Sequence, residues 1–152
     1  MTDIVDVKKK VREILLADSG VSAVVGARVN IGWVERPLNR TLNVPCITIV
    51  DPSEQGEIGM LGGAQDEYNG IIQVDVWCKG DGKSGPLNRD ELAKAVKVAL
   101  GKKVNFAAMQ AAGFVLSSPS VVALDEPEEG VEPPFYRKML RFPVTYYSDS
   151  YA

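Results

Sequence analysis

Few residues of this chain combine the types and spacing that enzymatic chemistry requires. The 152-residue sequence contains no histidine, which excludes Ser-His-Asp triads, Cys-His pairs and histidine-ligated zinc. Its two cysteines, Cys46 and Cys78, lie in separate apolar runs and are predicted to be buried, reduced thiols. Asp75, with Asp66 or Glu67, could form a carboxylate pair for acid–base catalysis, but no motif surrounds them. The sequence therefore predicts a protein that is not an enzyme and uses no cofactor or metal.

Three further clusters have simpler explanations than ligand binding. The segment 125–134 carries five carboxylates, but their spacing does not match an EF-hand loop, and a solvated acidic loop is expected. Lys8, Lys9 and Lys10 point around a helix and do not form one stripe toward phosphates. The glycines of 59–63 lack the Lys-Ser/Thr pair that ends a phosphate-binding loop. A net charge of −3 gives no overall attraction to nucleic acid or to an anionic membrane.

Two main amphipathic helices are predicted to frame the chain. The first covers Asp3–Ala17, with Thr2 or Asp3 as its cap and a stripe of apolar residues along one side. The second runs from Asn88 to about Leu100, with Asn88 and Glu91 spaced as in a capping box. Shorter helical segments are expected over 21–25 and 106–112.

Two long segments alternate with a period of two, which is typical of strands. In Tyr68–Lys79 one side carries Ile72, Val74, Val76 and Cys78, and the other carries Ile71, Gln73, Asp75 and Trp77. In Phe135–Tyr147 the core side carries Leu140, Phe142, Val144 and Tyr146, and the other carries Met139, Arg141 and Thr145. The second side of each strand is expected to be exposed or to face a partner.

Shorter strands complete the predicted domain. They are expected over Arg28–Val34, Pro45–Val50 and Phe114–Leu124, the last divided near Pro119. Together the elements predict one α+β domain over residues 1–152 with the order α-β-β-β-α-(α)-β-β. Its sheet is expected to be mostly antiparallel, with about four or five strands and two main helices.

Residues 52–67 are predicted to form a long flexible loop between two strands. The segment contains four glycines and an isolated apolar trio, Ile58, Met60 and Leu61. Connections of this length are commonly functional or disordered. We expect the apolar trio to become ordered on contact with a partner.

The order of these features is more specific than any one of them. A helix ending in Leu16-Ala17-Asp18 precedes a turn with Val24-Val25-Gly26, and strands follow over 45–49 and 72–77. A Gly/Pro break, a lysine-bearing helix, an acidic loop and a final strand ending in Pro143-Val144-Thr145-Tyr146-Tyr147 complete the order. From about Val7 to Tyr147, this resembles the tail terminator (tail completion) family of long-tailed bacteriophages and prophages. Segment 52–67 is longer than that family leads us to expect, and 105–112 has no counterpart in it.

The resemblance implies a structural virion protein that forms a hexameric ring at the head-proximal end of a phage tail. Such a ring ends polymerisation of the tail tube protein and presents a surface to the head-side connector protein, while DNA passes through its channel without specific binding. The implied location is the neck region of the virion tail, after assembly in the host cytoplasm. No membrane association is expected, because no segment approaches the roughly 20 apolar residues of a membrane span.

A ring requires subunit contacts, and the second sides of the long strands supply candidates. Ile71, Trp77 and Met139 are predicted to lie at a subunit interface, unless the helices cover both sheet faces within one subunit. Ile58, Met60 and Leu61 are predicted to contact the tail tube or a neighbouring subunit. Two other functions fit the sequence: a head–tail connector or neck protein, and a small non-viral α+β ligand-binding domain.

Overall fold

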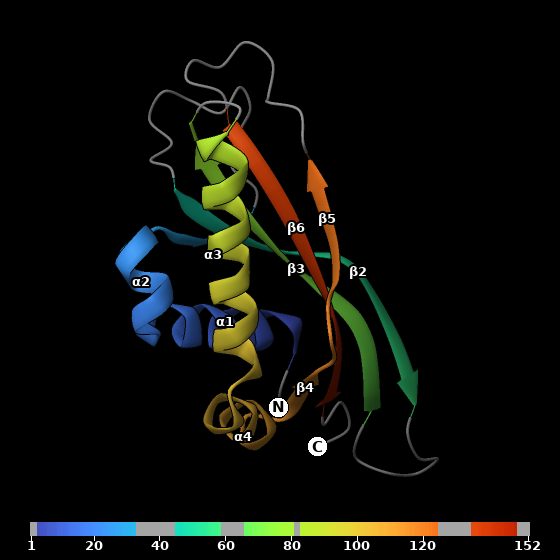
Figure 1. Cartoon of the computed structure of the whole chain (residues 1–152). Coiled ribbons are helices and arrows are strands. Elements are labelled where there is room, and N and C mark those ends of the chain that lie inside the picture. The colour runs from blue at the N-terminus through green and yellow to red at the C-terminus, as the bar shows by residue number, and fades with distance from the viewer. Residues whose placement is uncertain (1–2, 33–44, 59–65, 81–82, 125–134, 149–152) are drawn as a thin grey trace.

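The computed structural model describes residues 3–32, 45–58, 66–80, 83–124 and 135–148. Four helices and six strands are assigned in these ranges, and along the chain two helices precede three strands, twice in succession (Figure 1). Their bounds are α1 (Ile4–Ala17), α2 (Ser19–Val25), β1 (Val29–Ile31), β2 (Cys46–Ile58), β3 (Asp66–Lys79), α3 (Ser84–Gly101), α4 (Lys103–Ala111), β4 (Phe114–Leu116), β5 (Ser120–Leu124) and β6 (Phe135–Ser148).

One sheet contains all six strands. Its order is β1-β2-β3-β6, and β4 and β5 both pair with the far edge of β6. β1 is parallel to β2, and every other pair is antiparallel. The predicted α+β class is confirmed, but the sheet is mixed and has more strands than expected. The extra strand arises because the break near Pro119 divides the expected strand 114–124 into β4 and β5, which pair with different parts of β6.

The N-terminal helix forms largely as predicted. The Asp3 carboxylate accepts hydrogen bonds from the N–H groups of Val5 and Asp6, and the Asp6 carboxylate accepts from the Asp3 N–H, which completes a capping box. Asp18 ends α1 and caps α2, where its carboxylate accepts from the Val21 N–H and from Lys102 Nζ at 2.7 Å. The hydrogen bond from Lys102 lowers the pKa of Asp18.

The predicted start of the second main helix is wrong. α3 begins at Ser84, so Asn88 and Glu91 lie inside the helix and not at its cap. The Gly85-Pro86 pair was expected to break the chain, but Pro86 falls in the first helical turn. A proline is tolerated there because the N–H groups of the first turn have no partner within the helix.

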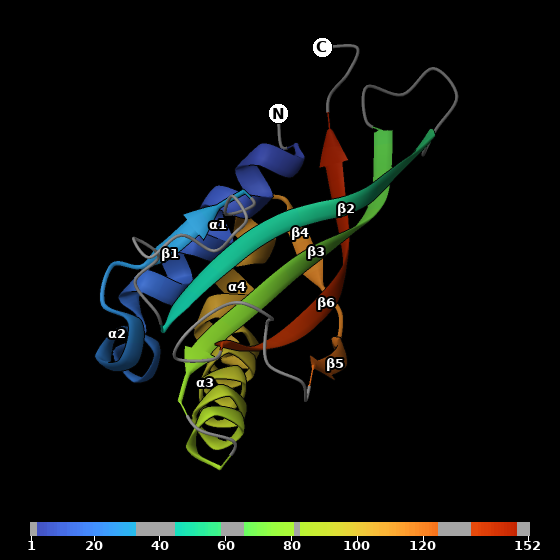
Figure 2. The same cartoon turned by 90° about the horizontal axis from the view of Figure 1, so that it is seen from above.

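The predicted long loop over 52–67 is wrong for residues 52–58 and 66–67, which lie in β2 and β3, while residues 59–65 lie outside the described ranges. β2 and β3 pair continuously from Ser53↔Ile71 to Ile58↔Asp66, after an irregularity at 50–53 that contains Pro52. This part of the sheet forms an arm that extends away from the helices (Figures 1 and 2). The backbone of Ile58 ends β2, while Met60 and Leu61 lie outside the described residues.

The hydrophobic core lies between the sheet and the helices, on the side of the sheet that we call the helix face. The helix face carries the predicted core side of both long strands, including Ile72, Val74, Leu140 and Phe142. Val7, Val11, Ile14 and Leu15 of α1 and Leu92, Val96 and Leu100 of α3 belong to the same buried cluster. The alternation of β3 and β6 therefore predicted the core side of both strands correctly.

Both cysteines are free thiols, as predicted, and both are buried. Burial raises the pKa of Cys46 to about 12 and that of Cys78 to about 11. None of the helices in the described ranges is long and apolar enough to cross a membrane.

Candidate assembly surface

The second side of the sheet, which we call the opposite face, carries the other set of side chains from the long strands. The helices gather on the helix face (Figures 1 and 2). Strand register places Gln73 beside Arg141, Asp75 beside Met139 and Trp77 beside Arg137 on the opposite face. These cross-strand pairs contain both the predicted interface residues and several charged groups.

A polar network links β3 to β6 on the opposite face. Gln73 Nε2 donates hydrogen bonds to both carboxylate oxygens of Asp75 at 3.0 Å, and Arg141 Nε donates to Gln73 Oε1 at 3.0 Å. Gln73 and Asp75 are fully or almost fully buried. Burial raises the pKa of Asp75, against the opposing effects of Gln73, Arg137 and Arg141. The centre of this face is therefore buried, which the alternating pattern did not predict.

Trp77 is covered within a single chain. Its exposed fraction is 2%, its Nε1 donates a hydrogen bond to Thr48 Oγ1 at 3.1 Å, and the Arg137 guanidinium carbon lies 4.9 Å from the ring centroid. A guanidinium over an indole ring at this distance is a cation–π contact. Trp77 thus has almost no surface left for a neighbouring subunit to cover.

The other two predicted interface residues lie in a partly exposed apolar patch. Ile71 and Met139 are half-buried, and their cross-strand neighbours Pro143 and Val122 are exposed. We call Ile71, Pro143, Met139 and Val122 the apolar patch; the Gln73–Arg141 pair separates its two halves. The sequence did not indicate Val122 or Pro143 as part of this patch, because no local feature shows that β5 pairs with β6 or that Ile71 lies opposite Pro143.

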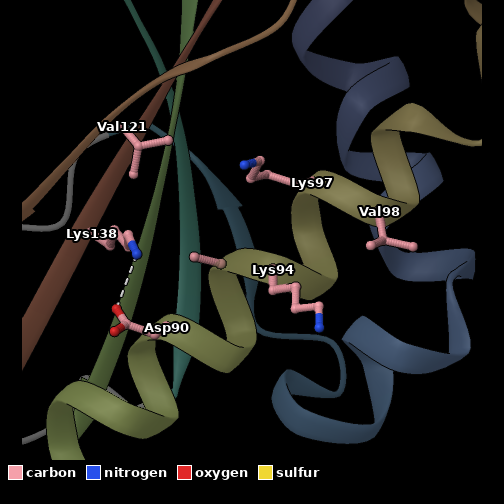
Figure 3. Close-up of a pocket in the computed structure, with 7 residues that line it drawn as sticks. Asp90, Lys94, Lys97, Val98, Val121 and Lys138 are labelled. Atoms are coloured by element: carbon pink, nitrogen blue, oxygen red, sulfur yellow. Dashed lines mark hydrogen bonds and ion pairs between the residues drawn. The ribbon is translucent and has the colours of Figure 1, made fainter.

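A groove separates α3 from β5 and β6 on the helix face. Its volume is about 280 Å³, and its lining consists of Asp90, Ala93, Lys94, Lys97, Val98, Val121 and Lys138 (Figure 3). Lys138 Nζ lies 3.1 Å from Asp90 Oδ1, which also accepts from Arg89 Nε. Burial alone would raise the pKa of Asp90, but these hydrogen bonds hold it below its ordinary value. The lining of the groove thus combines apolar side chains with three lysines and one carboxylate.

The residues considered for acid–base chemistry and metal binding are not gathered at either surface in the described ranges. Within the described ranges, no group of three or more His, Cys, Asp or Glu side chains is placed to hold a metal ion. The buried carboxylate of Asp75 is engaged by Gln73, and Asp66, its possible partner, is paired with Ile58 and Ser148 at the far end of β3. The structure therefore does not bring together the carboxylates that could have formed an acid–base pair.

The described chain belongs to the α+β class, with one sheet that carries its helices on one face. No family model matches the sequence, and no curated protein matches it either. Among solved structures, a chain from a structure described as "Virion of native gene transfer agent (GTA) particle" is similar in fold, with 17% sequence identity and a TM-score of 0.44. The match covers 93% of this chain and 94% of that chain.

Proposed function

We propose that this protein is a structural virion component that forms a ring at the head-proximal end of a phage tail. In this role it ends polymerisation of the tail tube and joins the tail to the head. The proposal is supported by the order of sequence features described above. The observation that carries it in the structure is the apolar patch, which lies on the sheet face that the helices leave uncovered.

The apolar patch is suited to a subunit contact. Val122 is 43% exposed, and Met139 and Ile71 retain part of their surface in the single chain. Burying such a patch against a second subunit removes apolar surface from water, which contributes about 25 cal/mol per Å². A specific contact would bury roughly 1,200–2,000 Å² in total.

The arm formed by β2 and β3 is the proposed contact with the tail tube. Its backbone is paired from Ser53↔Ile71 to Ile58↔Asp66, and this end of the two strands extends away from the helices (Figures 1 and 2). Ile58, Met60 and Leu61 stand at or next to the connection between the two strands in the sequence. The head-side connector would meet another surface of the ring, and DNA would pass through the channel without specific contacts.

Shortening the tip of this arm tests the tube contact. Replacing residues 59–65 with Asn-Gly should join β2 to β3 through a two-residue turn and keep the sheet intact. In an assembly reaction with the tail tube protein, wild type is expected to stop tube growth, whereas this variant is expected to give overlong tubes with an unchanged melting temperature. Electron microscopy of tube lengths is the measurement.

A matched control keeps the length of the tip. Gln65→Ser leaves Met60 and Leu61 in place and is expected to stop tubes as wild type does. If the shortened variant stopped tubes at the normal length, the arm would not be the tube contact.

Two alternatives remain distinct from this proposal. A head–tail connector or other neck ring would use the same kind of subunit contact but would not stop tube growth. A monomeric ligand-binding domain would need a pocket, and small-molecule pockets typically span about 300–1,000 Å³ with convergent polar groups. The groove beside α3 is smaller than this range, at about 280 Å³, and its polar groups are mainly lysines. These features favour the assembly role.

A further inference from the structure

The groove beside α3 continues onto an unpaired strand edge. Among the described residues β5 pairs only with β6, and no described strand pairs with its other edge. Val121 and Val122 are 40% and 43% exposed and point to opposite sides of this edge. Open strand edges of this kind commonly accept a strand from a partner.

The rim of the groove carries cations that are available to a partner. Lys94 and Lys97 are exposed on α3 and form no ion pair with any described residue, whereas Lys138 is paired with Asp90. Of the lining residues, Lys97 and Lys138 point toward the space between α3 and β6 near Val121, whereas Lys94 and Val98 point away from Val121 (Figure 3). The chemistry of this site fits an extended peptide with carboxylates on one side.

The same chain contains such a peptide. We propose that the groove and the edge of β5 receive the acidic segment 125–134 of a neighbouring copy of this protein. Within that segment Glu128-Glu129-Gly130-Val131-Glu132 is free of proline, so every residue has an N–H to donate, and its length equals that of β5. In an extended conformation Glu128 and Glu132 share one side, which would face the lysines, while Val131 on the other side would face Val122.

This inference rests on the proposed ring and specifies how it closes. A head-to-tail ring requires two different, complementary surfaces on each subunit. The cationic groove supplies one surface, and the acidic segment supplies the other. Because the apolar patch also reaches β5 through Val122, the neighbouring copy would cover both sides of the same strand.

Charge exchange between two variants tests the contact. Lys94→Glu with Lys97→Glu reverses the groove, and Glu128→Lys with Glu132→Lys reverses the segment. Each variant alone is expected to weaken ring formation by about tenfold or more, because like charges then meet across the contact. A 1:1 mixture is expected to restore rings that contain both variants in equal numbers. Native mass spectrometry measures the composition of these rings directly.

Two controls distinguish the proposed contact between copies from a general effect of charge and from a contact within one copy. Lys9→Glu with Lys103→Glu makes the same change in net charge at exposed residues outside the groove, and should leave rings intact. The four substitutions in one chain restore charge matching both within a chain and between chains. Suppose that the chain with all four substitutions formed rings but the 1:1 mixture of the two double variants did not. Each segment would then occupy the groove of its own chain, and the inference would be wrong. Rings unaffected by either double variant would also overturn it, whereas absence of rings in wild type would overturn the proposed function itself.

Discussion

Met139→Arg is expected to convert rings into single subunits at concentrations where wild type is fully assembled. Met139 is half-buried on the opposite face, with Asp75 and Val122 as its cross-strand neighbours. Arg137 and Arg141 flank it on the same face of β6, so a third guanidinium would concentrate positive charge where the neighbour must pack. Burying an additional guanidinium against an apolar contact costs several kcal/mol because the charge loses its water. Each 1.4 kcal/mol is about a tenfold change, so association should weaken by about 100-fold or more.

Sedimentation velocity over a concentration series measures this change. Val104→Arg is the matched control, because Val104 is 72% exposed on α4 and lies away from the apolar patch. Both variants should unfold at the same urea concentration as wild type, since an arginine at a partly exposed position can extend into water. If Met139→Arg still formed rings at the concentrations where wild type is assembled, the apolar patch would not be part of the subunit contact.

Gly85→Ala is expected to lower the free energy of unfolding by about 2–3 kcal/mol, because it overfills a tightly packed site. Gly85 lies in the first turn of α3 and is buried against the ring of Tyr136, whose exposed fraction is 4%. A Cβ at this position would overlap Cδ2 and Cε2 of that ring. Tyr136 is held in β6 beside Cys78 of β3, so the ring cannot move away without disturbing the sheet.

Gly101→Ala is the matched control for this substitution. Gly101 ends the same helix, and a Cβ there would meet nothing within 4 Å. Alanine is about 0.8–1.0 kcal/mol more favourable than glycine inside a helix, so this variant is expected to be as stable as wild type or slightly more stable. Urea unfolding of the three proteins gives the comparison. Equal stability of Gly85→Ala and wild type would contradict the close packing of Gly85 against Tyr136.

The sequence was most informative where structure depends on local periodicity. The helix face of β3 and β6 was predicted residue by residue, because alternation alone assigns Ile72, Val74, Leu140 and Phe142 to one side. Asp3, one of the two residues predicted to cap α1, does cap it, because a helix cap involves residues close in sequence. Features that depend on residues close in sequence could thus be predicted without knowledge of the fold.

The missed features depend on contacts between distant residues. Gly56 and Pro52 suggested a loop over 52–67, but pairing of β2 with β3 overrides the local preference. Trp77 was predicted to lie at a subunit interface. In the structure it contacts Arg137 and Thr48, which come from two other strands of the same chain. The groove beside α3 could not be predicted either, because Val121 and Lys97 meet only through the pairing of β5 with β6.

Native mass spectrometry of the wild-type protein, alone and with tail tubes added, tests the central claim most directly. The proposed role predicts a hexamer, formed by the protein alone or only on the tubes, with tube growth stopped where it binds. A monomer or dimer that ignores the tubes would contradict the ring, and would leave a small α+β binding domain as the better account of this chain.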